Sequence, residues 1–302
     1  MDSGYTLDIE ALKWFLVEVG SYNAELVYNP SELSLIYHYT DLNGLKGIVE
    51  DSDLWFTHSR YSNDDEELTH GTQIAREVID AQGRAPADTA KEQFLNSVRD
   101  MLTSTVAMDT YVCCFCEQDD LLSQWRSYSA NGTGVSIGFD INRFYEITGP
   151  DSPPSVGLVR LWKVFYREAT QRDIVKHALD FHWSKLGELS IQQRAKQAVD
   201  AIRFFIPTFK SHDFEEEKEM RLILTPFPNC PIRQQFRVAR GMLVPYYSLK
   251  KLYGMAWRLP IARVRVGPSV NRSLNVESAR ILLDNSGYTD IPVDSSNTPY
   301  RG

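Results

Sequence analysis

The sequence predicts an α+β fold in which mainly antiparallel strands form one sheet and helices are added around it. Strands are predicted where apolar side chains gather in short runs bounded by turn residues. These runs lie at residues 37–40, 54–57, 111–116, 134–139, 158–166, 219–224, 236–239, 263–266 and 291–293. The runs alternate irregularly with helical patterns, which favours an α+β fold over a doubly wound parallel sheet.

Amphipathic segments with apolar residues three to four positions apart predict the helices. They lie at residues 6–20, 42–49, 65–81, 88–103, 121–130, 170–205 and 274–283. We expect residues 1–33 to form an N-terminal helical appendage, which is either a cap or an interaction helix. Residues 34–302 are expected to form a single α+β domain with a helical insertion near residues 168–206.

Composition and charge exclude several classes of protein. The chain has 302 residues, 43% of them hydrophobic, with a net charge of -8. This acidic balance disfavours broad attraction to nucleic acid or to anionic membranes. No apolar stretch approaches the ~20 residues of a membrane span. The first ten residues carry three acidic side chains and no basic region, unlike a secretory signal, so a cytoplasmic location is expected.

Other residue groups have simple structural interpretations. Three of the four cysteines, Cys113, Cys114 and Cys116, crowd into one strand, which suits small core residues better than a disulfide framework or a zinc site. No histidine shows metal-ligand spacing, so no metal is expected. The three arginines at positions 233, 237 and 240 are interpreted as a solvated strand edge and its turn.

Two strands carry candidate ligand-binding side chains. His38 and Thr40 alternate along the first strand and so share a face, where an imidazole and a hydroxyl could hold a ribose. Their other interpretation is a satisfied core histidine and its neighbour. On the extended stretch that begins the 219–224 strand, Glu217, Glu219 and Arg221 are expected on one face. Such a carboxylate row is otherwise a solvated edge.

An ordered series of motifs resembles an uncharacterised bacterial family catalogued as domain of unknown function 2971. The motifs are Tyr37-His38-Tyr39-Thr40, Ser62-Asn63-Asp64-Asp65-Glu66-Glu67, Trp125-Arg126-Ser127-Tyr128, Gly132-Thr133-Gly134 with Ile137-Gly138-Phe139-Asp140, Phe214-x-x-Glu217-x-Glu219-x-Arg221 and Ser296-x-x-Pro299-Tyr300-Arg301. The first strand, with the helix that follows it, and the late Glu-x-Glu also resemble DNA-modifying ADP-ribosyltransferases. That resemblance implies a split, mainly antiparallel sheet and NAD as substrate.

The same resemblance implies roles for the two strands. Glu219 would bind the ribose 2'-hydroxyl and stabilise the oxocarbenium-like transition state as nicotinamide leaves. Glu217 would orient the acceptor. His38 would bind the adenosine ribose, with Thr40 in support.

Two further segments could complete the cofactor-binding site. Ser62, Asn63 and Asp64 could reach the same cleft from the loop after the second strand, although helix capping also explains Ser62 or Asn63. The 125–128 motif could offer aromatic faces from Trp125 and Tyr128 and a cation from Arg126 for pyrophosphate. Its aromatic side chains could equally pack their helix onto the sheet.

The function expected from the resemblance is cleavage of the nicotinamide–ribose bond of NAD. ADP-ribose would pass to a macromolecular acceptor, protein or nucleic acid, or to water, as in a toxin or anti-phage effector. An antitoxin or a second copy of the chain would then be a natural partner, and no membrane is involved. The alternative is a non-enzymatic nucleotide-sensing or protein-interaction module. A nucleic-acid phosphotransferase would need a basic groove, which the net charge does not indicate.

Overall fold

The structure, a computed structural model, describes residues 11–12, 15–16, 18–19, 33–61, 66–83, 89–103, 109–148, 156–184, 189–227, 230–239, 241–254 and 258–299. These residues form an α+β fold around one mixed, mostly antiparallel sheet, so the α+β prediction is confirmed. Only β10 and β9 pair in parallel among the strands described. No helix in the described ranges is both long and apolar enough to cross a membrane.

Within the described residues, the sheet contains ten strands. Their bounds are β1 (Leu35–Thr40), β2 (Trp55–His58), β3 (Tyr111–Cys116), β4 (Val135–Asp140), β5 (Gly157–Lys163), β6 (Glu219–Pro226), β7 (Gln235–Ala239), β8 (Met242–Ser248), β9 (Ile261–Val266) and β10 (Val293–Ser295). The order is β10-β9-β4-β1-β3-β2-β8-β7, and β6 joins β3 and β5. Strand β8 has no counterpart among the predicted strands.

The helices lie where the amphipathic patterns predict them, with α6 and α9 in addition. Their bounds are α2 (Leu42–Asp51), α3 (Glu66–Gly83), α4 (Thr89–Thr103), α5 (Leu122–Tyr128), α6 (Ile141–Thr148), α7 (Glu168–Ser184), α8 (Ile191–Phe205), α9 (Leu249–Tyr253) and α10 (Arg272–Asn285). Short 3-10 segments follow β2 (Ser59–Tyr61) and α8 (Ile206–Thr208). A further 3-10 segment, His212–Glu217, leads into β6.

The sheet divides at strand β3. One edge of β3 pairs with β6 along its whole length. On the other edge, β2 pairs with Tyr111 and Val112, and β1 pairs with Cys116 alone. Residues 113–115 therefore have no strand partner on that edge within the described sheet. We call this opening the fork, with β1 on one arm and β2, β8 and β7 on the other.

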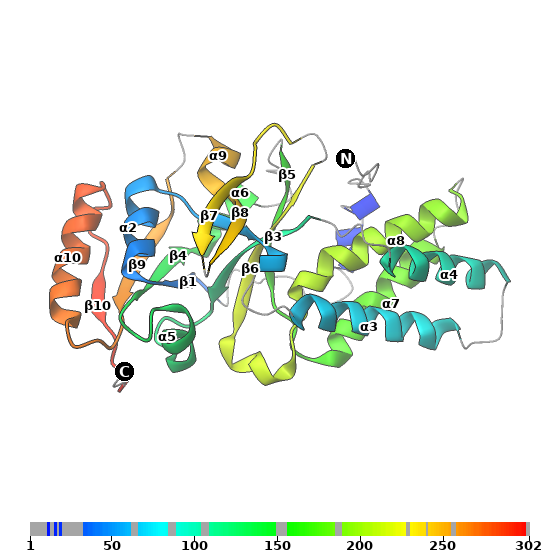
Figure 1. The fold of residues 1–302 in the computed structure, drawn as a ribbon, viewed down its shortest axis with the longest axis horizontal. Coiled ribbons are helices and arrows are strands. Elements are labelled where there is room, and N and C mark those ends of the chain that lie inside the picture. Colours follow the sequence, from blue (N-terminus) through cyan, green and yellow to red (C-terminus); the bar gives the residue numbers. More distant parts are fainter. Residues whose placement is uncertain are drawn as a thin grey trace.

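Two hydrophobic cores lie on opposite faces of β3 and β6. One is covered by α2, α6, α9 and α10 and contains Phe115 and Leu222. The other contains Val112 and Ile223 and is covered by α3, α4, α7 and α8, which we call the helical lobe. Figure 1 shows this lobe on the right and most of the sheet on the left. The lobe joins the predicted insertion to two helices from earlier in the chain.

The N-terminal appendage packs against the helical lobe. Among its described residues, Leu12, Phe15 and Val19 are buried in the same core as α7 and α8. The Phe15 ring lies 5.6 Å from that of His182 and 6.1 Å from that of Phe205. In the described part of the appendage, the apolar face thus covers the chain's own helices.

Candidate functional site

A cluster of four charged side chains, three of them buried and one half-buried, lies at the start of β6. We call it the charge cluster, and it consists of Lys210, Glu217, Glu219 and Arg221. Arg221 donates to both oxygens of Glu219, from Nε and Nη2, each at 2.8 Å. Lys210 Nζ lies 2.5 Å from Glu217 Oε2 and 3.3 Å from Glu219 Oε2. Two cations and two carboxylates sum to no net charge, which offsets the cost of burying them.

Glu219 is only 8% exposed, so the solvated-edge interpretation is wrong for this residue. Burial by itself would raise the pKa of its carboxyl group. The charge and hydrogen bonds of Arg221, with Lys210 and the Cys114 thiol, outweigh burial and hold the pKa at about 2. Glu219 is therefore an ionised carboxylate at neutral pH.

Glu217 belongs to the charge cluster, but its backbone is not the extended strand that the sequence predicts. It ends a 3-10 segment rather than extending the strand, because Lys218 adopts a left-handed conformation with φ of 44°. The expected row of Glu217, Glu219 and Arg221 on one strand face is wrong for Glu217. Its side chain nevertheless meets Lys210 and accepts a hydrogen bond from the Tyr128 hydroxyl at 3.3 Å. Burial raises the pKa of Glu217, although Lys210 lowers it.

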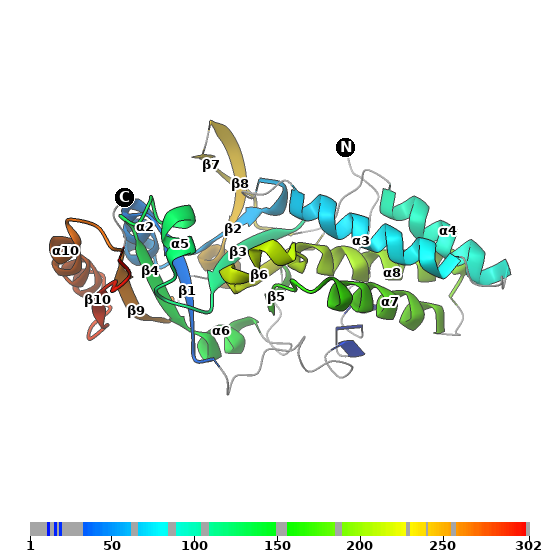
Figure 2. The ribbon, with the colours of Figure 1, turned by 90° about the horizontal axis from the view of Figure 1, so that it is seen from below.

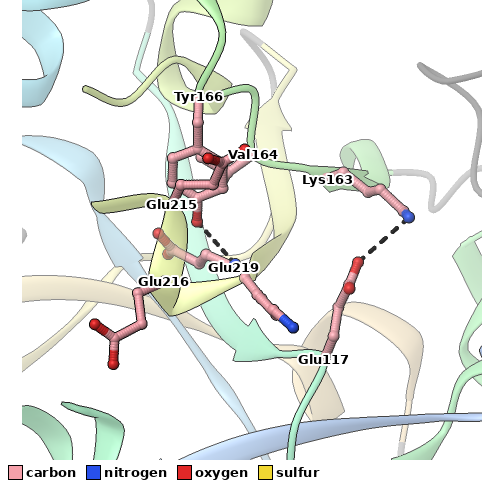
Figure 3. Close-up of a pocket in the computed structure, with 8 residues that line it drawn as sticks. Glu117, Lys163, Val164, Tyr166, Glu215, Glu216 and Glu219 are labelled. Carbon is pink, nitrogen blue, oxygen red and sulfur yellow. Dashed lines mark hydrogen bonds and ion pairs between the residues drawn. The ribbon is translucent and has the colours of Figure 1, made fainter. Parts of the chain in front are cut away.

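A pocket of about 530 Å³ lies beside the charge cluster. It is lined by Glu117, Lys163, Val164, Tyr166, Glu215, Glu216, Lys218 and Glu219. Figure 3 shows the Tyr166 hydroxyl above Glu219 and the Lys163–Glu117 ion pair on the other side. The hydroxyl oxygen of Tyr166 accepts a hydrogen bond from the Glu219 backbone N–H at 2.8 Å. This contact fixes the point where the chain enters β6.

His38 lies at the fork. Its Nδ1 is 2.8 Å from the Cys114 carbonyl oxygen, which points to the unpaired edge of β3. Because a carbonyl can only accept, Nδ1 carries the proton, and burial lowers the pKa of His38 and keeps the ring neutral. Nε2 is then a hydrogen-bond acceptor.

The register separates His38 from Glu219 across the sheet. Tyr37 pairs with Cys116, which pairs with Glu219, so these three side chains share a face. His38 points to the other face, where its ring lies 5.8 Å from that of Phe115. The two predicted site residues meet only through Cys114. Its carbonyl contacts His38, and its thiol interacts with Glu219.

Thr40 shares a face with His38, as predicted, but its hydroxyl lies against helix α2. A Cβ built at Gly44 would overlap the Thr40 hydroxyl oxygen and lie 3.0 Å from Thr40 Cβ. The helix begins there because the Asp41 side chain caps it by accepting from the Gly44 N–H at 2.7 Å. Thr40 therefore positions α2 against β1.

Helix α5 places one side chain against the charge cluster and one in the core. Tyr128 reaches Glu217, whereas Trp125 is fully buried, lies 4.8 Å from the Tyr39 ring and donates to Asp120 at 2.7 Å. Trp125 thus follows the packing alternative, and its ring is not available to a ligand. Arg126 lies on the exposed side of the helix.

The other predicted segment of the cofactor-binding site follows strand β2. Ser62, Asn63 and Asp64 lie outside the described residues. Glu67 falls in α3, but its side chain is likewise outside the description.

Cys114 departs from the expectation that the cysteines fill the core. Cys113 and Cys116 are buried, but Cys114 is exposed in the middle of the central strand. Desolvation by the surrounding protein nevertheless raises the pKa of its thiol well above the usual value, and the negative charge of Glu219 adds to that rise. No group of metal-ligating side chains occurs among the described residues.

Sequence reasoning missed two polar contributors to this region. Lys210 follows an isolated bridge between Phe165 and Phe209, in a segment with no helical or strand pattern. Tyr166, whose hydroxyl accepts from the Glu219 backbone N–H, lies just beyond β5. A lysine seven residues before a Glu-x-Glu was the available signal for Lys210, but spacing across irregular backbone does not predict contact.

Comparison with known proteins identifies one family. Residues 124–222 match the model of the family described as protein of unknown function (DUF2971). This segment runs from α5 to the middle of β6 and includes all four residues of the charge cluster. No curated protein and no solved structure matches the chain. Over residues 124–222, about a third of its length, the chain is similar to the DUF2971 family of proteins of unknown function.

Proposed function

We propose that the chain binds NAD at the fork and cleaves the nicotinamide–ribose bond. The observation that supports this most is the convergence of His38 and Glu219 on Cys114. From opposite faces of the sheet, a neutral hydrogen-bond acceptor contacts the carbonyl of this residue and an ionised carboxylate contacts its thiol. An acceptor suits a ribose hydroxyl, and a fixed negative charge suits the cation that develops at the anomeric carbon.

The chemistry assigns different tasks to the two glutamates. As the C–N bond breaks, its electron pair leaves with neutral nicotinamide, and Glu219 stabilises the positive charge left on the ribose. Water or a macromolecular nucleophile then forms the new bond to the anomeric carbon. Glu217, whose pKa is raised, is suited to take the proton that this nucleophile loses. Transfer to a macromolecule would fit a toxin or anti-phage effector whose partner is an antitoxin.

One observation favours a second function, a nucleotide-sensing module without turnover. Both oxygens of Glu219 already accept hydrogen bonds from Arg221. A carboxylate compensated in this way stabilises a developing cation less than an uncompensated one would. Under this alternative the charge cluster holds the fork in shape and no bond is cleaved.

Nicotinamide release from NAD distinguishes the two functions. We expect wild-type protein to release nicotinamide, with or without cell lysate, and Glu219→Gln to lose most of that release. Glu217→Gln should slow release less for hydrolysis than for transfer to a lysate acceptor. Glu277→Gln is the control, because Glu277 is exposed on helix α10 and lies outside both the charge cluster and the pocket. Absence of release by wild-type protein in both conditions would favour the sensing module.

A further inference from the structure

A second group of side chains lies on the β2–β8–β7 arm of the fork. The Trp55 ring, 40% exposed, stacks on the Tyr246 ring with centroids 4.3 Å apart and planes inclined by 25°. The Arg237 guanidinium carbon lies 5.8 Å from the Trp55 ring centroid, and Nη2 donates to the Thr57 hydroxyl at 3.0 Å. The indole and the guanidinium are thus held in place by neighbours before any ligand arrives.

The strand register puts this group on the open face of the fork. Thr57 pairs with Val112 on β3 and with Tyr246 on β8, so these side chains share a face. Trp55 lies two residues before Thr57, and Cys114 lies two residues after Val112 on the antiparallel strand. Both side chains therefore point to the same face as Thr57 and Val112. Trp55 therefore flanks the exposed Cys114, just where β2 diverges from β3.

Arg237 approaches the fork from the neighbouring strand β7. It pairs with Val244 on β8, and its side chain crosses that strand to reach Thr57 on β2. Its positive charge acts on both His38 and Cys113. Burial lowers the pKa of His38 and Arg237 adds to that shift, whereas burial raises the pKa of the Cys113 thiol and Arg237 offsets part of the rise. A cation near both strands suits an anionic ligand lying in the opening between them.

Such a pair of side chains matches the two parts of a purine nucleotide. An exposed indole gives a flat apolar surface for a base, and a guanidinium binds phosphate through paired N–H donors. We propose that Trp55, supported by Tyr246, stacks on the adenine of a nucleotide while Arg237 binds its phosphates. This subsite takes the fork of the proposed function as its location and does not depend on bond cleavage.

Titration with ADP, followed by isothermal calorimetry, tests the subsite without requiring turnover. We expect wild-type protein to bind ADP and Trp55→Ala to bind it about 5- to 150-fold more weakly, the range given by loss of one stacked base. Arg237→Ala should also weaken binding and reduce its sensitivity to salt. Phe236→Ala is the matched control, because Phe236 is the adjacent residue on β7 and lies 56% exposed on the opposite face.

A second measurement uses the wild-type protein and so does not depend on a variant that folds. N-bromosuccinimide oxidises exposed indoles, and peptide mass spectrometry reports the extent at Trp55. ADP should protect Trp55, and nicotinamide mononucleotide, which lacks adenine, should protect it much less. Equal protection by both, no protection by ADP, or equal ADP affinity in Trp55→Ala and wild type would overturn the subsite.

The outcomes also separate this subsite from the proposed reaction. If Glu219→Gln abolishes nicotinamide release but binds ADP normally, both proposals stand. If wild-type protein releases nicotinamide but does not bind ADP, the reaction stands and the subsite does not. If wild-type protein binds ADP through Trp55 and releases no nicotinamide, the subsite stands as the nucleotide site of a sensing module.

Discussion

At Glu219, paired cations keep a buried carboxylate ionised, and this has a consequence for stability. Removing one member of a buried ion-paired group leaves its partners uncompensated. We expect Glu219→Gln to lower the free energy of unfolding at neutral pH by about 3 kcal/mol. Glu216→Gln, at an exposed position, should change it by less than about 0.5 kcal/mol.

The pH dependence of that loss follows from the depressed pKa of Glu219. The group stabilises the fold above its ordinary value of 4.5, and this contribution disappears as the pH falls towards the folded-state value of about 2. Urea denaturation of wild type and Glu219→Gln at pH 6, 4.5 and 3.5 should show a difference that shrinks below pH 4.5. A constant difference would mean that the Glu219 carboxylate is not the source.

Cys114 should react slowly although solvent reaches it. The thiolate is the nucleophile, and the raised pKa of Cys114 leaves little thiolate near pH 8. Iodoacetamide labelling followed by mass spectrometry should show modification far slower than that of a model thiol peptide. Glu219→Gln removes the negative charge beside the sulfur and should speed labelling. Unchanged labelling in that variant would contradict the thiol–carboxylate interaction.

The side-chain positions along a strand could be predicted from the sequence, whereas contacts between distant segments could not. Alternation along a strand was enough to place Glu219 with Arg221, because the side-chain period of a strand is two. The burial of Trp125 and the contact of Lys210 with two glutamates depend on segments that meet only in the folded chain. No local pattern encodes such contacts.

At the scale of elements, helix α2 and strand β1 approach closely through one glycine. A side chain at Gly44 would collide with Thr40, whereas a Cβ at Gly47, one turn later, meets nothing within 4 Å. Gly44→Ala should destabilise the protein by about 1–3 kcal/mol through this overlap. Gly47→Ala should be neutral or stabilise by up to about 1 kcal/mol, since alanine favours the helix. Thermal unfolding of both variants checks the contrast.

The elements that were not predicted share a physical cause. Strand β8 contains Pro245 and follows the turn at Gly241, so its pattern reads as a loop, yet pairing with β7 and β2 on its two edges makes it a strand. The 3-10 segment before β6 reads as extended because its side chains are acidic rather than amphipathic. In both cases tertiary contacts override a weak local preference.

At the scale of the whole molecule, the β7–β8 hairpin projects away from the rest of the fold (Figure 2). In the described sheet, β7 pairs only with β8, which leaves its other edge open. Val238 on that strand is 81% exposed and pairs with Leu243, also exposed. An open apolar edge promotes pairing between chains, and a lysine blocks it.

We therefore expect Val238→Lys to reduce concentration-dependent self-association in light scattering or sedimentation. Val270→Lys is the control, because Val270 is fully exposed but precedes α10 and belongs to no strand edge. An equal effect of the two substitutions would assign the change to net charge alone.

The neutrality of the charge cluster has a consequence for the rate at which an anionic nucleotide arrives. Two cations and two carboxylates packed together produce a field that fades within a short distance, so the far field comes from the net charge of -8. A polyphosphate ligand approaches against this repulsion until it nears Arg237. Added salt should then accelerate association, the reverse of ordinary electrostatic steering, and stopped-flow measurements across ionic strength would reveal it.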